Sequence, residues 1–435
     1  MTSHPDNWSR SRALEAGGVF LCALTTRLAY LAWRGPAASP DTVEYLTLAR
    51  NLMAHGIFSL ETSAPYAPSI RRAPFYPAFL ALFDWLGLGS PAVVASIQAV
   101  MDAAVAVAVL VLAQRLVRSK WARAAALMYA LHPGAIVSST TLLSETVFTD
   151  LLVGSALALV VGLERSRLWL VAISGFWLGL AILCRPTALL LPGAIVVVLQ
   201  FAREVRRPFV VAAIFLGAVT SLLCPWIIRS SLLAGRFVPV QTYGAVNFYV
   251  ATRLDWDWRN EAFWWPRVWE DLGIRAAKTP EEMADLDRWF MKEAVRNILS
   301  EPTSYLASRA KALPYLFVTS FDKFTGINNS FGVVMAQRDL GHLLVKVSLL
   351  VLFSLIPICM AIVGLGYSRS HPVAWLSAVF WVYTVAIHAP QFFENRYLWP
   401  AIPFVLQSAA IGVSRMEDIL RRRARRRRSW RGDPR

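Results

Sequence analysis

The sequence divides around one long polar stretch, SPDTVEYLTLARNLMAHGIFSLETSAPYAPSIRRAPFYP, at residues 39–77. It follows a first apolar run, 13–33, and precedes the next apolar run of membrane-spanning length, 91–114. Two acids, Asp41 and Glu44, stand near its start, and an arginine pair stands near its end. Charged groups beside a membrane need water, a partner or a function. The stretch therefore predicts an organised segment at one membrane face.

The composition is that of a membrane protein. The 435 residues are 56% hydrophobic and 17% charged, whereas soluble domains are about 45–50% apolar and about 25% charged. The four cysteines lie within or at the ends of apolar runs, which argues against a disulfide framework. The first apolar run is long enough to span, and no small-residue cleavage site clearly follows it, so a cleavable signal peptide is not expected.

The apolar runs predict an all-α polytopic membrane protein with about ten transmembrane helices, each of roughly 17–25 residues. A shorter apolar stretch, 74–88, is expected to be an interfacial or partial helix, and Pro186 is expected to break the long stretch 168–202. The expected spans are 13–33, 91–114, 121–138, 146–163, 168–184, 186–202, 208–228, 345–366, 373–389 and 397–414.

The charge distribution predicts the topology. The formal net charge is +16, and a cytoplasmic N-terminus places net positive charge in every inner loop and in the tail, as the positive-inside rule requires. Both termini are then cytoplasmic, in the inner or plasma membrane. The tail from residue 415 is interpreted as a topology anchor that also binds anionic lipid, rather than nucleic acid.

This topology places two long polar loops, 34–89 and 231–344, on the extracytoplasmic face. In the second loop, the tryptophan cluster at 253–272 suits a helical segment at the membrane–water boundary, and 281–299 has an amphipathic helical period. The expected organisation is an N-terminal transmembrane module with the first loop (1–230), a Trp-rich helical loop region (231–344), C-terminal transmembrane helices (345–414) and a basic cytoplasmic tail (415–435).

Asp41 and Glu44 have two interpretations. The first is structural, because an N-cap Asp followed three residues later by Glu forms a capping-box pattern at a helix start. The second is catalytic, because the helix dipole keeps a carboxylate at an N-terminus ionised, and an ionised carboxylate can accept a proton from an acceptor hydroxyl.

The arginine pair Arg71 and Arg72, followed by the Pro-Phe-Tyr-Pro run that contains Tyr76, is also ambiguous. The arginines either snorkel to the interface or form a clamp for an anion such as phosphate. Glu145 either belongs to a helix N-terminus capped by Ser144 or is a second acid facing the same cavity as Asp41.

Three further arginines, Arg185, Arg229 and Arg396, lie at expected outer helix ends, and Tyr397 follows the last of them. Snorkelling explains any one of them, but as a set they run against the positive-inside bias and suit an anionic headgroup. No metal-ligand spacing, phosphate loop or nucleophile elbow is present in the sequence. No cofactor is predicted, and a requirement for a divalent metal is left open.

The order of the motifs resembles the GT-C superfamily of integral-membrane glycosyltransferases, in particular its bacterial protein-mannosyltransferase-like and aminoarabinose-transferase-like members. The similar segments are RLAYL, SPDTVEYLTLARNLMAHGIFS, RRAPFYPAFLAL, LLSETVF, GLAILCRPTALLLP, PWIIRSSLLAGRFVPVQTYGAVNFY and ENRYLWPAIPF. The region 253–340 has no such similarity, and Arg229-Ser230 stands where relatives often have Arg-Asn.

The resemblance implies a polyprenyl-phosphate-linked sugar as donor, used on the outer face. It implies that Asp41 is the catalytic base with Glu44 beside it, that Arg72 belongs to the donor-site segment, and that Glu145 is a secondary acidic site residue. The expected activity is inverting transfer of a hexosyl or pentosyl group to a hydroxyl of a protein, lipid or glycan. The alternative is a transporter or flippase, which would show repeated halves and polar residues near the membrane midplane.

Overall fold

The computed structural model describes residues 10–201, 205–255, 268, 277–317, 321–325, 331–367, 372–392 and 394–430. Over these residues the regular structure is helical, with one isolated bridge between Ala37 and Thr141. Six helical segments are long and apolar enough to cross a membrane, which confirms an all-α, multi-pass membrane protein. They are α1 (Arg10–Arg34), α4 (Pro91–Ala113), α7 (Ser144–Glu164), α10 (Pro208–Ala234), the run Leu340–Tyr367, which contains α17 (Leu340–Leu350) and α18 (Ile356–Tyr367), and Arg396–Ala424, most of which belongs to α20 (Ile402–Trp430).

Three expected spans are shorter helices: α8 (Leu168–Cys184), α9 (Leu191–Phe201) and α19 (Pro372–His388). The expected break at Pro186 is confirmed, because α8 ends just before it and a 3₁₀ turn, η1 (Pro186–Ala188), follows. A second short 3₁₀ helix, η5 (Asn395–Ala401), precedes α20.

The expected single span 121–138 is wrong. It is divided between α5 (Ser119–Ala130) and α6 (Pro133–Thr140). Pro133 has no N–H to continue the ladder of α5 and instead begins α6, where it is tolerated. The His132 side chain caps the new helix by accepting a hydrogen bond from the N–H of Gly134 at 3.0 Å.

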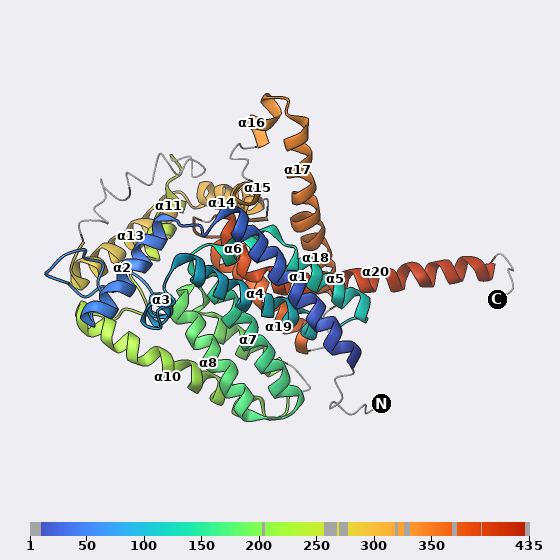
Figure 1. Ribbon diagram of the computed structural model, residues 1–435, viewed down its shortest axis with the longest axis horizontal. Coiled ribbons are helices and arrows are strands. Elements are labelled where there is room, and N and C mark those ends of the chain that lie inside the picture. Colours follow the sequence, from blue (N-terminus) through green and yellow to red (C-terminus); the bar gives the residue numbers. More distant parts are fainter. Residues whose placement is uncertain are drawn as a thin grey trace.

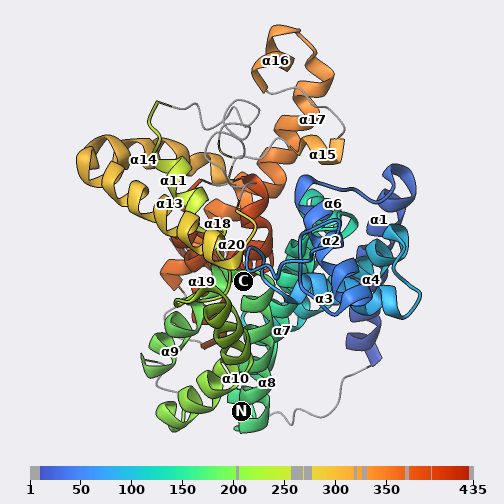
Figure 2. The same ribbon diagram turned by 90° about the vertical axis from the view of Figure 1, so that its left-hand side faces the viewer.

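The helices pack as a bundle in which α7 lies along α8, α8 lies along α10, and α18 lies along α20 (Figure 2). The last pair approaches through glycines. A Cβ atom added at Gly364 would meet the carbonyl oxygen of Ser408, and one added at Gly412 would meet that of Met360. Small residues of this kind let two helix backbones come close within a membrane.

The helices of the two polar loops gather at the end of the molecule away from both termini (Figure 1). From the first polar loop come α2 (Pro40–His55) and α3 (Phe75–Trp85), so the stretch 74–88 is a short helix as expected. From the second come α11 (Ala245–Thr252), α13 (Pro280–Ser300) and α14 (Pro302–Phe317). The amphipathic helix expected at 281–299 is confirmed as α13, which buries Met283, Phe290 and Ala294. The expected interfacial helix at 253–272 falls largely outside the described residues.

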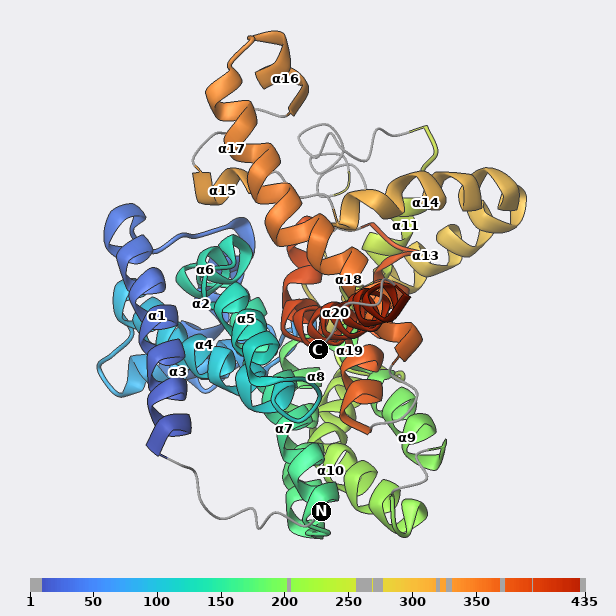
Figure 3. The same ribbon diagram turned by 90° about the vertical axis from the view of Figure 1, so that its right-hand side faces the viewer.

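Two segments project from the helical bundle. The run from α16 (Phe331–Ala336) into α17 projects from it (Figure 3), and the basic end of α20 extends away as a continuous helix (Figure 1). The start of α5 pairs with the later part of α20, where Lys120 lies 2.5 Å from Glu417, and with the start of α1, where Arg123 lies 3.0 Å from Glu15. The beginning of α1 and the basic segment of α20 therefore lie at one end of the molecule.

Substitution of Gly364 by Ala should destabilise the protein by about 1–3 kcal/mol, because the α18–α20 contact has no room for a methyl group. Gly366, on the same helix, has open space around it, so Gly366→Ala is the matched control and should leave stability unchanged or slightly raised. Thermal unfolding in detergent would compare the two. Equal melting temperatures for both variants would contradict the close packing.

Candidate active site

Helix α2 begins at Pro40, with Ser39 as its N-cap. The expected capping box of Asp41 and Glu44 is therefore wrong: the reciprocal pair is Ser39 and Thr42, whose hydroxyl accepts a hydrogen bond from the N–H of Ser39 at 2.9 Å. The Thr42 hydroxyl also donates to the carbonyl of Leu142 at 2.8 Å, which ties the helix start to the connection between α6 and α7. Ser39 and Thr42 perform the capping, and both carboxylates are directed to other partners.

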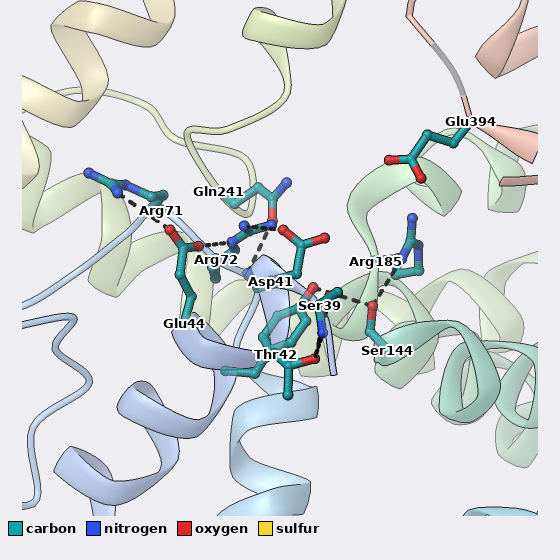
Figure 4. A network of polar contacts seen from close by, with 12 residues as sticks. Ser39, Asp41, Thr42, Glu44, Arg71, Arg72, Ser144, Arg185, Gln241 and Glu394 are labelled. Atoms are coloured by element: carbon teal, nitrogen blue, oxygen red, sulfur yellow. Dashed lines mark hydrogen bonds and ion pairs between the residues drawn. The ribbon is translucent and has the colours of Figure 1, made fainter. Parts of the chain in front are cut away.

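Arg72 joins the two acids of α2. Its Nη2 lies 2.7 Å from Asp41 Oδ1, and its Nε lies 2.5 Å from Glu44 Oε2. Figure 4 shows Arg72 reaching between the two carboxylates. The guanidinium also lies 4.5 Å from the ring centre of Tyr243, a cation–π distance. Neighbouring Arg71 is 3.6 Å from Glu44 and donates to the carbonyl of Ala277 at 3.1 Å.

Arg396, near the other end of the sequence, also contacts Asp41. Its Nη2 lies 3.2 Å from Asp41 Oδ2, and its Nη1 lies 3.4 Å from Glu145 Oε1. Its Nε is 2.7 Å from Oε2 of Glu394, two residues earlier in the chain. One guanidinium thus contacts carboxylates from three separate segments.

Glu145 is the most buried acid of the group, with 2% of its side chain exposed. Arg185 Nη1 lies 3.0 Å from Glu145 Oε1 and donates to the Ser144 hydroxyl at 3.0 Å. Helix α7 begins at Ser144 itself, with Leu143 as N-cap, so the expected cap at Ser144 is wrong. Its hydroxyl instead receives Arg185.

These contacts form one ion-pair cluster of four carboxylates and four guanidinium groups: Asp41, Glu44, Glu145, Glu394, Arg71, Arg72, Arg185 and Arg396. Their formal charges cancel. Burial disfavours the charged form of Asp41, but the charges and hydrogen bonds of Arg72 and Arg396 outweigh it and lower the pKa of Asp41 to about 2. Asp41 is therefore ionised at neutral pH, in the form that accepts a proton or a hydrogen bond.

The structure places the two tyrosine candidates differently. Tyr397 faces the cluster, with its ring centre 5.7 Å from the guanidinium groups of both Arg185 and Arg396. The Tyr76 hydroxyl points away and donates to the Gln98 side chain at 2.9 Å. Its ring packs edge-on against that of Tyr45, with 5.0 Å between the ring centres. Tyr76 therefore packs against α2.

Arg229 lies outside the cluster. Its Nη1 donates to the carbonyl of Ser69 at 3.4 Å, and its guanidinium stacks 4.5 Å from the ring centre of Trp226. It lines a largely apolar groove of about 400 Å³ between α2, α3 and the end of α10, with Phe58 and Leu233 among the walls. Among the described residues, no carboxylate pairs with Arg229.

Several residues of the site were not chosen from the sequence. Glu394 stood in a motif but gave no sign of which arginine it would bind. Gln241, which accepts a hydrogen bond from the N–H of Ala73 at 3.1 Å, and Tyr243 lie in a segment that resembles the family, but neither was chosen as a site residue. Asp150 is a deeper acid of α7, and its charged neighbours are Arg27 and Asp102 rather than the cluster. The described residues contain no group of acids, histidines and cysteines suited to hold a metal.

The pKa of Asp41 predicts how the cluster contributes to stability. The folded-state pKa of about 2 is below the ordinary value of 3.8, so the contribution is present above about pH 4 and is lost as the pH falls towards 2. Asp41→Asn should lower the free energy of unfolding by about 2 kcal/mol at pH 7. The difference from the wild type should shrink by pH 2.5 in thermal unfolding, whereas the exposed control Asp84→Asn should show no difference at either pH. A penalty for Asp41→Asn that is constant with pH would contradict the ion pairs.

Comparison with known proteins agrees with this architecture. Residues 71–228 match the family described as dolichyl-phosphate-mannose-protein mannosyltransferase. The fold is similar to that of the oligosaccharyltransferase AglB from Archaeoglobus fulgidus in complex with an inhibitory peptide and a dolichol-phosphate. That match has a TM-score of 0.58 and 15% identity, and covers 98% of this chain and 53% of AglB.

The apo form of the Archaeoglobus fulgidus oligosaccharyltransferase gives a TM-score of 0.55 at 16% identity, over 95% of this chain and 52% of that one. ArnT from Cupriavidus metallidurans bound to undecaprenyl phosphate gives 0.43 at 14% identity, over 91% and 78%. No curated protein matches by sequence, and the chain spans about half the length of the oligosaccharyltransferases. The chain is a multi-pass membrane protein, and its fold is of the GT-C type.

Proposed function

We propose that this protein is a glycosyltransferase that moves a hexosyl or pentosyl group from a polyprenyl-phosphate donor to an acceptor hydroxyl, with Asp41 as the general base. The observation that carries the proposal is the ionised carboxylate of Asp41, mounted in the first turn of α2 and held by Arg72 and Arg396. A carboxylate fixed in this way is ionised and held in a defined position, as a general base must be.

The reaction balances without a cofactor. The acceptor oxygen attacks the anomeric carbon, and its proton passes to Asp41. The bond between the anomeric carbon and the phosphate oxygen breaks, and the electron pair leaves with the lipid phosphate. A single displacement of this kind inverts the anomeric centre. Glu44 and Glu145 hold the arginines in place, and Arg72 and Arg396 stabilise negative charge as it develops on the phosphate.

The donor lipid fits the groove beside Arg229. Its walls are mainly apolar and include the end of the membrane-spanning helix α10, which suits a prenyl chain. Arg229 has no carboxylate partner among the described residues, whereas the cluster arginines are already paired. Arg229 also donates to the carbonyl of Ser69, which stands two residues before Arg71 in the chain.

The comparisons support a lipid-phosphate donor. AglB was solved with a dolichol-phosphate, and the family matched by residues 71–228 is named for a dolichyl-phosphate sugar and a protein acceptor. The acceptor proposed here is a protein, lipid or glycan hydroxyl at the extracytoplasmic face of the inner or plasma membrane. The positive-inside rule supports this orientation, and the basic end of α20 and the start of α1 both lie on the side of the molecule away from α2 (Figure 1).

Asp41→Asn should abolish sugar transfer, because Asn keeps the size of the side chain but cannot accept the proton. Membranes that contain the full-length protein would be incubated with a panel of radiolabelled polyprenyl-phosphate sugars, and labelled acceptor would be counted. Asp84→Asn, an exposed acid in the same polar loop, is the control and should keep full activity. Full transfer by Asp41→Asn would overturn the assignment, and movement of lipid-linked sugar across the membrane without transfer would favour a flippase.

Arg229→Gln should weaken binding of the donor lipid, because the groove loses its cation while its apolar walls remain. We expect the KM for the donor to rise about tenfold, the effect of losing about 1.4 kcal/mol, with a smaller change in kcat. Arg50→Gln, at an exposed position of α2, should leave both constants unchanged. A fall in kcat with an unchanged KM would place Arg229 outside the donor site.

A further inference from the structure

A second groove, of about 540 Å³, lies between residues 236–242, which lead away from α10, and one face of α13. It is separate from the groove beside Arg229, with which it shares no lining residue. Neither the proposed donor lipid nor the ion-pair cluster occupies this groove.

The inner end of this α13 groove leads toward Asp41. Thr242 and Asp287 line both the groove and a small cavity whose other walls include Arg71 and Tyr243. The N–H of Thr242 donates to the carbonyl of Ile70 at 3.0 Å. Arg71 then contacts Glu44, and the Tyr243 ring lies against Arg72. A ligand in the α13 groove would therefore approach the cluster along the segment that carries Arg71 and Arg72.

The rim of the groove carries uncompensated positive charge. Arg288 and Lys292 are exposed, one turn apart on α13, and in the described part of the chain neither pairs with an acid. Arg236 also lines the groove but is already paired with Asp285. The rim therefore favours a ligand with acidic groups.

The floor of the groove offers a carboxylate as a hydrogen-bond acceptor. Asp287 accepts a hydrogen bond from the N–H of Ala245 at 3.1 Å through Oδ1, and Oδ2 has no such donor among the described residues. Burial raises the pKa of Asp287 to about 6, so the group is mainly ionised at neutral pH. It can accept an N–H or O–H from a bound molecule.

Apart from Gln241 and Thr242 at the inner end, the remaining walls are apolar and decide the class of ligand: Phe237, Val238, Pro239, Ala284, Met291 and Val295. A glycan presents hydroxyls on every side, and many of them would lose water against these walls without gaining a partner. An extended peptide with alternating acidic and apolar side chains matches both the rim and the walls.

We propose that the α13 groove is the acceptor site and binds an acidic polypeptide segment. This inference rests on the proposed glycosyltransferase activity. Acidic side chains of the peptide pair with Arg288 and Lys292, apolar side chains fill the groove, and a backbone N–H donates to Asp287. A serine or threonine further along the peptide then presents its hydroxyl to Asp41.

The test measures binding without transfer. Full-length protein in detergent would be titrated against a fluorescein-labelled nonapeptide of alternating acidic and apolar residues that contains one serine, and anisotropy would be recorded. The acidic peptide should bind, and its counterpart with lysines for the acids should not. Arg288→Glu/Lys292→Glu should weaken binding about tenfold, because two rim charges contribute together about 1.4 kcal/mol.

Two further variants keep the result interpretable. Arg50→Glu/Lys311→Glu makes the same charge change at exposed positions outside the groove and should not alter binding. Val295→Trp fills the groove without a charge change and should weaken binding even if the double reversal fails to fold. Equal binding of acidic and basic peptides, or no effect of either groove variant, would overturn the proposal.

A charged glycan is the competing ligand. Displacement of the peptide by tetragalacturonate, with the same dependence on Arg288 and Lys292, would assign the groove to an anionic glycan and overturn the peptide assignment. The underlying activity is tested separately by transfer in Asp41→Asn. A peptide that binds to a protein without Asp41-dependent transfer would refute the activity and leave the groove in place.

Discussion

The arrangement of the site depends on the sharing of Asp41 between Arg72 and Arg396. Neither arginine is satisfied by Asp41 alone, because Arg72 also binds Glu44 and Arg396 also contacts Glu145 and Glu394. Removing one partner from a buried set of this kind leaves its neighbours with uncompensated charge. The first polar loop, the start of α7 and the segment before α20 are therefore held in one relative position.

The same interaction has two opposing effects on Asp41 as a base. Two arginines keep Asp41 ionised, but they also make it a weak base, since a group with a pKa of about 2 has little affinity for a proton. An incoming phosphate competes with Asp41 for the same guanidinium groups. Arg396, at 3.2 Å, makes the longer of the two contacts, and Glu394 offers it another carboxylate. A bound phosphate that draws Arg396 away would raise the pKa of Asp41 when the acceptor needs a base.

The sequence predicted the helical membrane class and most spans, because a membrane-length apolar run permits few other structures. It failed at 121–138, where composition alone does not show that Pro133 starts a new helix. It placed Asp41, Glu44, Arg71, Arg72, Glu145, Arg185, Arg396 and Tyr397 among the site candidates, and the structure brings these together. It could not separate Arg229 or Tyr76 from the group, because the direction of a side chain at a helix end depends on tertiary packing. Capping was assigned to the wrong residues for a related reason, since Ser39 and Thr42 compete for the same backbone groups.

The distance in sequence between Asp41 and Arg396 has a consequence for biosynthesis. Arg396 lies 355 residues after Asp41, in the short helix η5 that precedes α20. While the ribosome is still producing the middle of the chain, the nascent protein contains Asp41 and Arg72 but not the arginine that completes their cluster. The first polar loop therefore lacks one of its ion-pair partners until the segment before α20 has been synthesised. The cluster can assemble only after the segment that carries Arg396 has been synthesised.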